Sequence, residues 1–239
     1  MANLVIDIGN TAVKASWTEG ITLGRSFRYQ GEQVKEFILS LVEKEKPQTM
    51  VISSSYELSS EDIVVLEEKC DKLEILDKAH TRLLSQVGLP EYLGYDRAAS
   101  VLAAKYLFKG KGCSVFDLGT TITVDFTDEQ GKYLGGNISL GFRTRIKSLN
   151  HYSRSLPLID TPQEAEIIGN SLESSMASGV ISGIMFELSG YSGLYPGNII
   201  VFTGGDANFF AKRMKNSIFV VCNLVLMGLA LIADRYVKN

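Results

Sequence analysis

The chain reads Val5-Ile6-Asp7-Ile8-Gly9-Asn10-Thr11 near its start and Val115-Phe116-Asp117-Leu118-Gly119-Thr120-Thr121 near its middle. Each copy is an apolar run with an Asp, then a Gly and two hydroxyl or amide residues, before a second β-rich run. The pattern predicts a hairpin whose turn gathers a carboxylate, backbone N–H groups and hydroxyls, which can bind a polyphosphate and its metal ion. A single copy is equally well explained by an Asx-type turn. Two copies favour a duplicated fold with a nucleotide between its halves, and therefore an ATP-handling enzyme.

The composition is that of an ordinary globular protein. The 239 residues suffice for one large domain or two small ones, and 45% of them are hydrophobic. The net charge is −3, from 24 basic and 27 acidic residues, and no long basic stripe of the kind found in nucleic-acid-binding proteins is present. We therefore expect no nucleic-acid partner.

Cysteine usage and hydropathy predict where the protein works. Cys70, Cys113 and Cys222 are widely spaced, which fits free thiols in a reducing cytoplasm better than a disulfide framework. No basic leader precedes Asp7, so the N-terminus does not resemble a signal peptide. The most apolar stretch, 218–233, is shorter than the roughly 20 residues that a membrane-spanning helix needs. We expect a cytoplasmic protein without a membrane partner, with a buried strand and a core helix at 218–233.

Apolar periodicity predicts two similar blocks of strands and helices. In the first block we expect strands at 3–8, 12–17, 23–29 and 50–53, and helices at 32–45, 59–69 and 96–108. In the second block we expect strands at 113–118, 121–127, 131–139 and 199–202, and helices at 141–150, 162–188, 206–214 and 223–236. This order predicts an α/β protein with mixed sheets, divided into an N-terminal half at 1–110 and a C-terminal half at 111–239. Because no Pro- or Ser-rich linker separates the halves, we expect them to pack around a shared cleft.

Two further segments are candidates for ligand binding. Thr203–Ala207 follows an apolar strand and opens a helix, which predicts an adenosine-binding turn, with a simple N-cap by Asp206 as the alternative. Gly94–Arg97 opens another helix. Its Asp96 is either a cap with Arg97 as a surface partner, or a general base beside an anion-binding arginine.

Other motifs are weaker or missing. Gly135–Gly141 predicts a hairpin end followed by a helix start near the substrate. His80 and His151 lie far apart in the sequence without a ligand pattern, so a zinc site is not expected. Neither a Walker-type P-loop nor a G-x-S-x-G motif occurs, which argues against P-loop enzymes and serine hydrolases.

The order of these motifs resembles that of the type III pantothenate kinase family, which belongs to the superfamily of acetate kinases, sugar kinases, heat-shock proteins and actin. The resemblance rests on Asp7-Ile8-Gly9-Asn10-Thr11, Gly94-Tyr95-Asp96-Arg97, Asp117-Leu118-Gly119-Thr120, Gly135-Gly136 and Thr203-Gly204-Gly205-Asp206-Ala207, and extends to the closing 224–229 segment. It implies a duplicated ribonuclease H-like fold of the actin-like ATPase type, with two mixed-sheet halves around a nucleotide cleft.

The resemblance also implies an activity and a set of site residues. The activity is ATP-dependent phosphorylation of pantothenate to 4'-phosphopantothenate, the first step of coenzyme A biosynthesis. The residues implied to bind ATP are Asp7, Ile8, Gly9, Asn10, Thr11, Ala12, Val13, Lys14 and Thr120. Those implied to bind pantothenate are Gly94, Tyr95, Asp96 and Arg97, with Asp96 as the catalytic proton acceptor. Asp7 would hold Mg²⁺ with ATP, Asp117 would hold a monovalent cation, K⁺ or NH₄⁺, and the protein would be a homodimer.

Two positions depart from the family pattern, and both belong to the part that the family uses for pantothenate. Val87 stands where an aromatic residue is expected ahead of Pro90, and Leu172 stands where a threonine is expected after Gly169. Two alternatives stay open: a kinase of another small alcohol or sugar, and a non-catalytic ATP-binding regulator.

Overall fold

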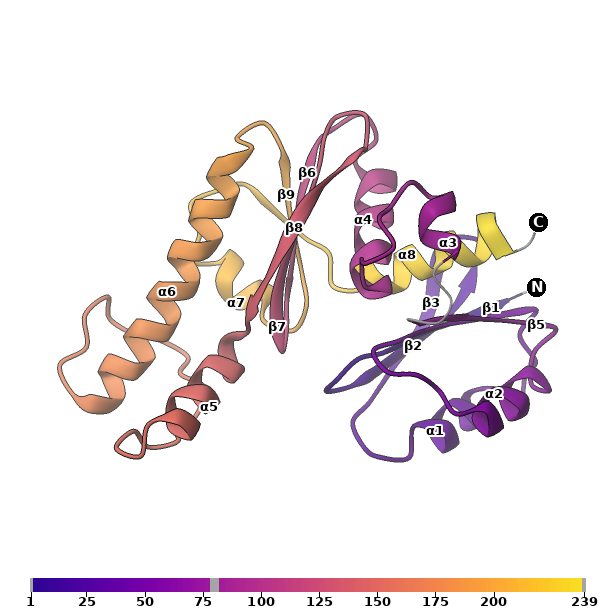
Figure 1. The fold of residues 1–239 in the computed structure, drawn as a ribbon, viewed down its shortest axis with the longest axis horizontal. Coiled ribbons are helices and arrows are strands. Elements are labelled where there is room, and N and C mark those ends of the chain that lie inside the picture. Colours follow the sequence, from indigo (N-terminus) through magenta and orange to yellow (C-terminus); the bar gives the residue numbers. More distant parts are fainter. Residues whose placement is uncertain (1, 78–81, 238–239) are drawn as a thin grey trace. The chain divides into compact units, whose positions relative to one another are not determined.

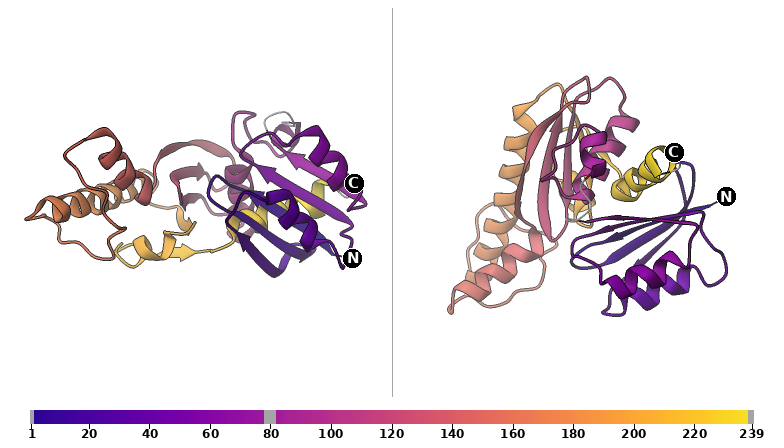
Figure 2. Two further views of the ribbon diagram at one scale, coloured as in Figure 1. Left: turned by 90° about the horizontal axis from the view of Figure 1, so that it is seen from below. Right: turned by 45° about the vertical axis from the view of Figure 1, so that its right-hand side comes forward.

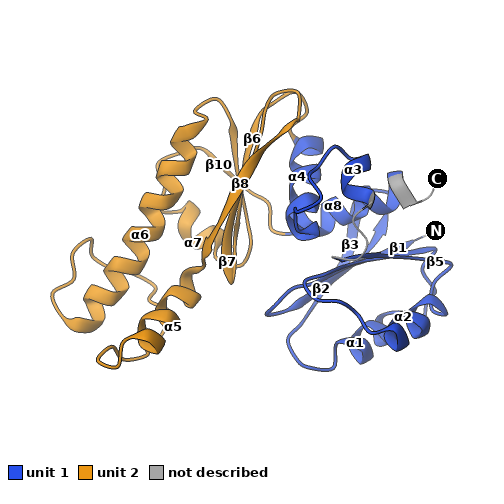
Figure 3. Cartoon of the chain, in the orientation of Figure 1, with its two compact units in different colours: residues 1–107, 223–239 blue, residues 108–222 orange. Residues whose placement is uncertain are grey.

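The computed structural model describes residues 2–77 and 82–237, so His80 lies outside the described residues. The chain forms two compact units, residues 1–107 with 223–239 and residues 108–222, each with its own five-stranded sheet (Figure 3). The expected halves at 1–110 and 111–239 differ from these units in residues 223–239, which return to the first unit. They do so because the closing helix packs on a helix and strands of the first unit.

The first unit is a mixed sheet with helices on both faces (Figures 1 and 2). The strand order is β3-β2-β1-β4-β5, in which β1 is antiparallel to β2 and parallel to β4. The strands are β1 (Asn3–Ile8), β2 (Val13–Glu19), β3 (Thr22–Tyr29), β4 (Thr49–Ser54) and β5 (Lys72–Leu76). The helices are α1 (Val34–Leu41), α2 (Ser60–Glu67), α3 (Arg82–Gln86), α4 (Tyr95–Leu107) and α8 (Leu224–Ile232), which continues as the π-helical turn η1 (Ala233–Val237).

Alternation along β1 divides its apolar side chains between two cores. Leu4 and Ile6 pack with Ile38 of α1 and with α2 on one face. On the other face, α4 and α8 cross so closely that a Cβ on Gly228 would overlap the carbonyl oxygen of Ala99. Only glycine permits this approach, which seats the apolar closing helix in the first unit.

The second unit repeats the same architecture. Its strand order is β10-β9-β6-β7-β8, in which β6 is antiparallel to β7 and parallel to β9. The strands are β6 (Cys113–Leu118), β7 (Thr121–Thr127), β8 (Tyr133–Leu140), β9 (Ile199–Thr203) and β10 (Ile218–Val220). The helices are α5 (Phe142–Tyr152), α6 (Leu172–Leu194) and α7 (Ala207–Ala211), which share a core with the sheet. The matching strand orders confirm the duplicated α/β fold that the repeated pattern predicts.

Several segments differ from the sequence-based expectation. Helix α3 is not predicted, and β10 is not the buried strand expected at the start of 218–233, since its residues are half-buried or exposed. Helix α6 begins at Leu172 instead of 162, because residues 162–171 are mostly exposed and have no apolar face to bury. Strand β5 is not predicted by the sequence, since it is short and only its last two residues are buried. Gly135 lies within β8, and the hairpin end and helix start expected within Gly135–Gly141 are found at Leu140 and Phe142. Among the described helices, none is both long and apolar enough to cross a membrane.

Candidate functional site

The first Asp loop joins β1 to β2. Its turn is closed by the Gly9 N–H, which donates to the Ala12 carbonyl at 3.2 Å. Asp7 precedes the loop, and the sheet register sets it opposite Lys14 on β2 and beside Ser53 on β4. Because opposite residues of an antiparallel pair project to the same face, this face of the hairpin carries a carboxylate next to an ammonium group.

The first Asp loop borders a pocket of about 320 Å³. The pocket is lined by Ile8, Gly9, Asn10, Thr11, Ala12, Val13, Tyr29, Gly31, Glu32, Val34 and Tyr56. The β4–α2 connection is tied to the loop, because the Ser55 N–H donates to the Ile8 carbonyl at 3.0 Å and the Ser55 hydroxyl donates to Asn10 Oδ1 at 3.4 Å. The six residues from Ile8 to Val13 that the resemblance assigns to ATP therefore line one pocket.

Sequence reasoning misses the far wall of this pocket, which consists of Tyr29, Gly31, Glu32, Val34 and Tyr56. Tyr29 stacks on Phe37 with ring centroids 4.8 Å apart. From the sequence, Tyr29 is therefore interpreted as a core residue and not as part of a pocket. These residues come from two segments that lie far from the loop in sequence. The one sequence signal for this wall is weak: a Gly-Glu pair directly before an amphipathic helix.

The second Asp loop joins β6 to β7, and its backbone is held by neighbouring segments. The Gly119 N–H donates to the Thr121 carbonyl at 3.0 Å. The Thr120 carbonyl accepts two hydrogen bonds from the start of α5, from the Gly141 N–H at 3.0 Å and from the Thr144 hydroxyl at 2.7 Å. The candidate ATP-binding residue Thr120 is therefore fixed by the start of a helix.

The turn at 203–207 lies at the same sheet edge as the second Asp loop. Asp117 is in register with Thr203 on the neighbouring parallel strand, and the Asp206 N–H donates to the Leu118 carbonyl at 2.9 Å. Gly204 has a φ of +92°, and a Cβ there would lie 2.5 Å from Asp117 Oδ1. The structure thus brings together two segments that the sequence singles out separately.

Asp206 does not behave as a simple helix cap. It holds the N-cap position of α7, but its side chain accepts no capping hydrogen bond from the described residues. Burial raises the pKa of its carboxyl group. Because this half-buried carboxylate does not cap its helix, the simple N-cap alternative does not explain Asp206. The interpretation of the turn as a ligand-binding segment therefore stands.

The Gly94–Arg97 segment forms the start of α4. Tyr95 and Arg97 are buried, whereas Asp96 is exposed and its Oδ1 accepts the Arg97 N–H at 2.8 Å. Burial, with Asp77 and Glu74 as further causes, raises the pKa of Tyr95 to about 12. Arg97 is therefore not the surface partner of Asp96 that the simpler interpretation requires.

Comparison with known proteins identifies the family. The family model of type III pantothenate kinase matches residues 3–192. The chain belongs to the type III pantothenate kinase family. Curated type III pantothenate kinases from Cytophaga hutchinsonii and Christiangramia forsetii are 37% and 35% identical to it, over 95% and 97% of this chain and 96% and 98% of theirs. As a member, the chain is an enzyme that phosphorylates pantothenate with ATP in coenzyme A biosynthesis.

Solved structures show the same fold at low sequence identity. A protein described as a Baf family transcriptional activator, from Campylobacter jejuni, has a TM-score of 0.65 at 21% identity, over 97% of this chain and 98% of that one. The ROK hexokinase from Thermus thermophilus has a TM-score of 0.54 at 13% identity, with the same coverage of both chains. The type III pantothenate kinase chain thus has the α/β fold of actin-like ATPases and sugar kinases.

The two departures from the type III pantothenate kinase pattern occupy different environments. Val87 is half-buried after α3, and its N–H donates to the Leu83 carbonyl at 3.1 Å. Leu172 is the exposed first residue of α6. The neighbouring Ser171 hydroxyl accepts the Ser174 N–H in a capping box, so this hydroxyl is already engaged in holding the helix start.

The donor set of the site fits the cations that a type III pantothenate kinase would use. Mg²⁺ bound with ATP needs only one or two protein carboxylates, since phosphate oxygens and water supply the other ligands. Asp7 can supply such a carboxylate, since it directly precedes the residues Ile8 to Val13 that line the pocket. Within the part of the chain that the structure describes, no group of three or more His, Cys, Asp or Glu forms a separate metal site. Asp117 is half-buried, and its Oδ1 and the Leu118 carbonyl oxygen would both lie 2.5 Å from a Cβ on Gly204; oxygen atoms of these two kinds are ligands that cations accept.

Proposed function

We propose that this kinase transfers the γ-phosphoryl group of ATP to the primary hydroxyl of pantothenate with Asp96 as the proton acceptor. The hydroxyl oxygen forms a bond to the γ-phosphorus, the bond from that phosphorus to the β,γ-bridging oxygen breaks, and ADP leaves. Asp96 takes the hydroxyl proton as the new bond forms. The observation that carries this assignment is the exposed Asp96 carboxylate between the buried residues Tyr95 and Arg97.

The remaining residues of the Gly94–Arg97 segment would hold pantothenate. Gly94 leaves room for the Asp96 carboxylate, because a Cβ on Gly94 would lie 2.6 Å from Asp96 Oδ1. Arg97 is the cation of this segment and is the candidate for the pantothenate carboxylate. Tyr95 is buried and would anchor the segment through its packing inside the unit.

The two Asp loops would bind ATP and its cations. Residues Asp7 to Lys14 would surround the phosphates, with Asp7 on the Mg²⁺ ion and Lys14 as a further positive charge. Thr120 would also contact ATP, and Asp117 would hold K⁺ or NH₄⁺. Bound cations neutralise phosphate charge that the protein carboxylates would otherwise repel.

The homodimer and the cytoplasmic location are also proposals. The second unit exposes large apolar side chains, with Phe186 at 71%, Ile138 at 62% and Leu194 at 60% of their maximal surface. Exposed apolar surface of this kind is typical of protein–protein interfaces. Cys70, Cys113 and Cys222 are all free thiols, which suits a reducing compartment.

A coupled assay of ADP release tests the function. Purified protein is supplied with Mg-ATP, ammonium and pantothenate, and parallel reactions contain a panel of sugars. We expect ADP release that depends on pantothenate. Activity with a sugar alone would assign a different alcohol substrate, and retained ATP binding without turnover on any acceptor would indicate a non-catalytic regulator.

Removal of the monovalent cation tests the role of Asp117. Replacing K⁺ and NH₄⁺ by a large organic cation is expected to weaken ATP binding, since the charge near Asp117 is lost. Titration calorimetry with Mg-ATP measures the effect directly. The same affinity in both buffers would contradict a cation at Asp117.

A further inference from the structure

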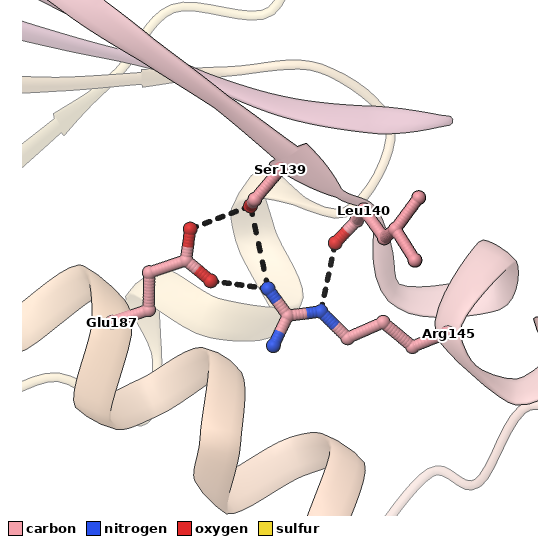
Figure 4. Close-up of polar contacts among 4 residues, drawn as sticks. All are labelled: Ser139, Leu140, Arg145 and Glu187. Atoms are coloured by element: carbon pink, nitrogen blue, oxygen red, sulfur yellow. Dashed lines mark hydrogen bonds and ion pairs between the residues drawn. The ribbon is translucent and has the colours of Figure 1, made fainter. Parts of the chain in front are cut away.

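A cluster of three polar side chains joins β8, α5 and α6 in the second unit (Figure 4). Arg145 of α5 donates from Nε to the Leu140 carbonyl at 2.8 Å and from Nη2 to Ser139 Oγ at 3.3 Å. The same Nη2 forms an ion pair with Glu187 Oε2 of α6. The Ser139 hydroxyl donates to the other carboxylate oxygen of Glu187 at 2.5 Å. Each of the three side chains therefore contacts the other two.

The cluster is partly shielded from solvent. The side chains of Arg145 and Glu187 retain 22% and 18% of their maximal surface. Arg145 Nη1 lies over Gly183, one helical turn before Glu187, where a Cβ would be 3.7 Å away, in ordinary contact. A guanidinium group held from several directions in a partly buried place has a more defined geometry than an exposed ion pair.

What the cluster fixes is the corner between β8 and α5. Leu140 is the last residue of β8, and Gly141 is the N-cap of α5. Arg145 belongs to α5, and its side chain binds the carbonyl of Leu140 at the end of β8. It thereby sets the direction in which the chain leaves the strand. The Arg145 N–H also donates to the Gly141 carbonyl at 2.9 Å, in the first turn of α5.

This corner in turn holds the second Asp loop. The Gly141 N–H and the Thr144 hydroxyl both donate to the Thr120 carbonyl. A Cβ on Gly141 would overlap the Gly119 carbonyl oxygen, so helix and loop are in direct backbone contact. A shift of the start of α5 must therefore move residues 119 and 120.

We propose that Arg145, Glu187 and Ser139 are positioning residues that hold the second Asp loop in the geometry that binds ATP and the monovalent cation. The inference rests on the proposed function, in which Thr120 contacts ATP and Asp117 holds the cation. The three residues act through the β8–α5 corner and not on the ligands themselves. Their loss changes ligand affinity at the second loop, while acceptor binding at the start of α4 is unaffected.

A matched control lies in the first unit. Lys35 of α1 and Asp62 of α2 form an interhelical ion pair at 2.9 Å, with side-chain exposures of 41% and 31%. Both carboxylates link two helices of one unit. Only the Glu187 pair is connected to an Asp loop by the hydrogen bonds described above. Glu187→Gln and Asp62→Asn each remove one charge with little change in shape.

The experiment is titration calorimetry of Mg-ATP in K⁺ buffer, together with steady-state kinetics. We expect Glu187→Gln to raise the Kd for Mg-ATP about fivefold and to raise the K⁺ concentration for half-maximal activity. The KM for pantothenate is expected to stay at the wild-type value. Asp62→Asn should leave all three quantities unchanged. Ser139→Ala removes the hydroxyl that bonds to both charged side chains but leaves their direct ion pair, and it is expected to give a smaller change in the same direction.

Several outcomes would overturn the inference. A lower melting temperature of Glu187→Gln with an unchanged Kd for Mg-ATP would show a structural role only. A rise in the KM for pantothenate as well as in the KM for ATP would show a general disturbance of the protein. So would the same change in Asp62→Asn. If Glu187→Gln does not fold, an unchanged Kd in Ser139→Ala would overturn it. Because the calorimetry needs no acceptor, a wild-type protein that binds Mg-ATP but is silent with pantothenate would overturn the proposed function and leave this inference open to the same measurement.

Discussion

The two units share one strand order but hold their Asp loops differently. In the first unit four residues separate the paired Ile8 and Val13, and the loop borders an open pocket. In the second unit three residues separate the paired Leu118 and Ile122, and the loop is bonded to α5 and to the 203–207 turn. Duplication has thus given two similar turns, of which the first borders a pocket and is bonded to the β4–α2 connection, whereas the second is bonded to a helix start and to the 203–207 turn.

The two units also differ in the residues that follow the parallel neighbour of each Asp-bearing strand, which is β4 in the first unit and β9 in the second. Asp7 is in register with Ser53, and the chain goes on through Ser54 and Ser55. Asp117 is in register with Thr203, and the chain goes on through two glycines and Asp206. The first unit offers the three hydroxyls of Ser53, Ser54 and Ser55 at this place, whereas the second offers the hydroxyl of Thr203 followed by bare backbone and a carboxylate.

The largest effect is expected outside both loops. If the loops bind ATP and Asp96 alone moves the proton, Asp96→Asn lowers kcat by about 10²- to 10⁴-fold and leaves the Kd for Mg-ATP unchanged. The ADP-release assay and calorimetry measure the two quantities. Asp71→Asn, at an exposed ion pair with Lys46, is the control. Near-normal turnover of Asp96→Asn would remove this residue as the base.

The bracing of the second loop predicts a difference between two glycine variants. A Cβ on Gly141 would overlap the Gly119 carbonyl oxygen, whereas a Cβ on Gly9 would lie 3.4 Å from the Ala12 carbonyl oxygen. We expect Gly141→Ala to lower the free energy of unfolding by about 1–3 kcal/mol. Gly9→Ala should melt close to the wild type. Thermal unfolding without ligand measures both, and equal melting temperatures would contradict the contrast.

A third variant tests the contact between Asp117 and the 203–207 turn. In Gly204→Ala, the Cβ meets both Asp117 Oδ1 and the Leu118 carbonyl oxygen at 2.5 Å, so the carboxylate and the backbone beside it must move. We expect a higher K⁺ concentration for half-maximal activity. Gly110→Ala is matched for backbone strain, since Gly110 has a φ of +76° but no atom within 4 Å of an added Cβ. An equal K⁺ response of both variants would exclude a specific effect on Asp117.

The smallest effect concerns Asp206. Burial raises the pKa of its carboxyl group, so its contribution favours folding below the ordinary pKa of an Asp and is lost as the pH rises through the folded-state value. The ionised, half-buried group is thus a cost at neutral pH. Asp206→Asn is expected to raise the melting temperature of the ligand-free protein slightly at pH 7 and not at pH 3. A gain of equal size at both pH values would contradict this origin.

Much of the fold follows from the sequence because both Asp loops lie between strands with clear apolar alternation. Strand β5 escapes prediction, since Lys72–Leu76 carries charged residues and only its end is buried. The start of α6 is misplaced because Ser171, with its capping box, is a stronger signal than the periodicity before it. Tyr29 and Tyr56 join the pocket only through tertiary packing, which no local pattern reveals.

The return of α8 to the first unit has a consequence for synthesis on the ribosome. Residues 108–222 carry all five strands of their sheet in one continuous stretch. The strands of the first unit are synthesised first. One face of its sheet nevertheless stays uncovered until Leu224–Ile232 has been synthesised. Because domains tend to fold as their chain becomes available, the second unit can be complete while α4 still exposes the apolar surface that α8 will bury. The part of the protein that is made first is thus the part that is finished last.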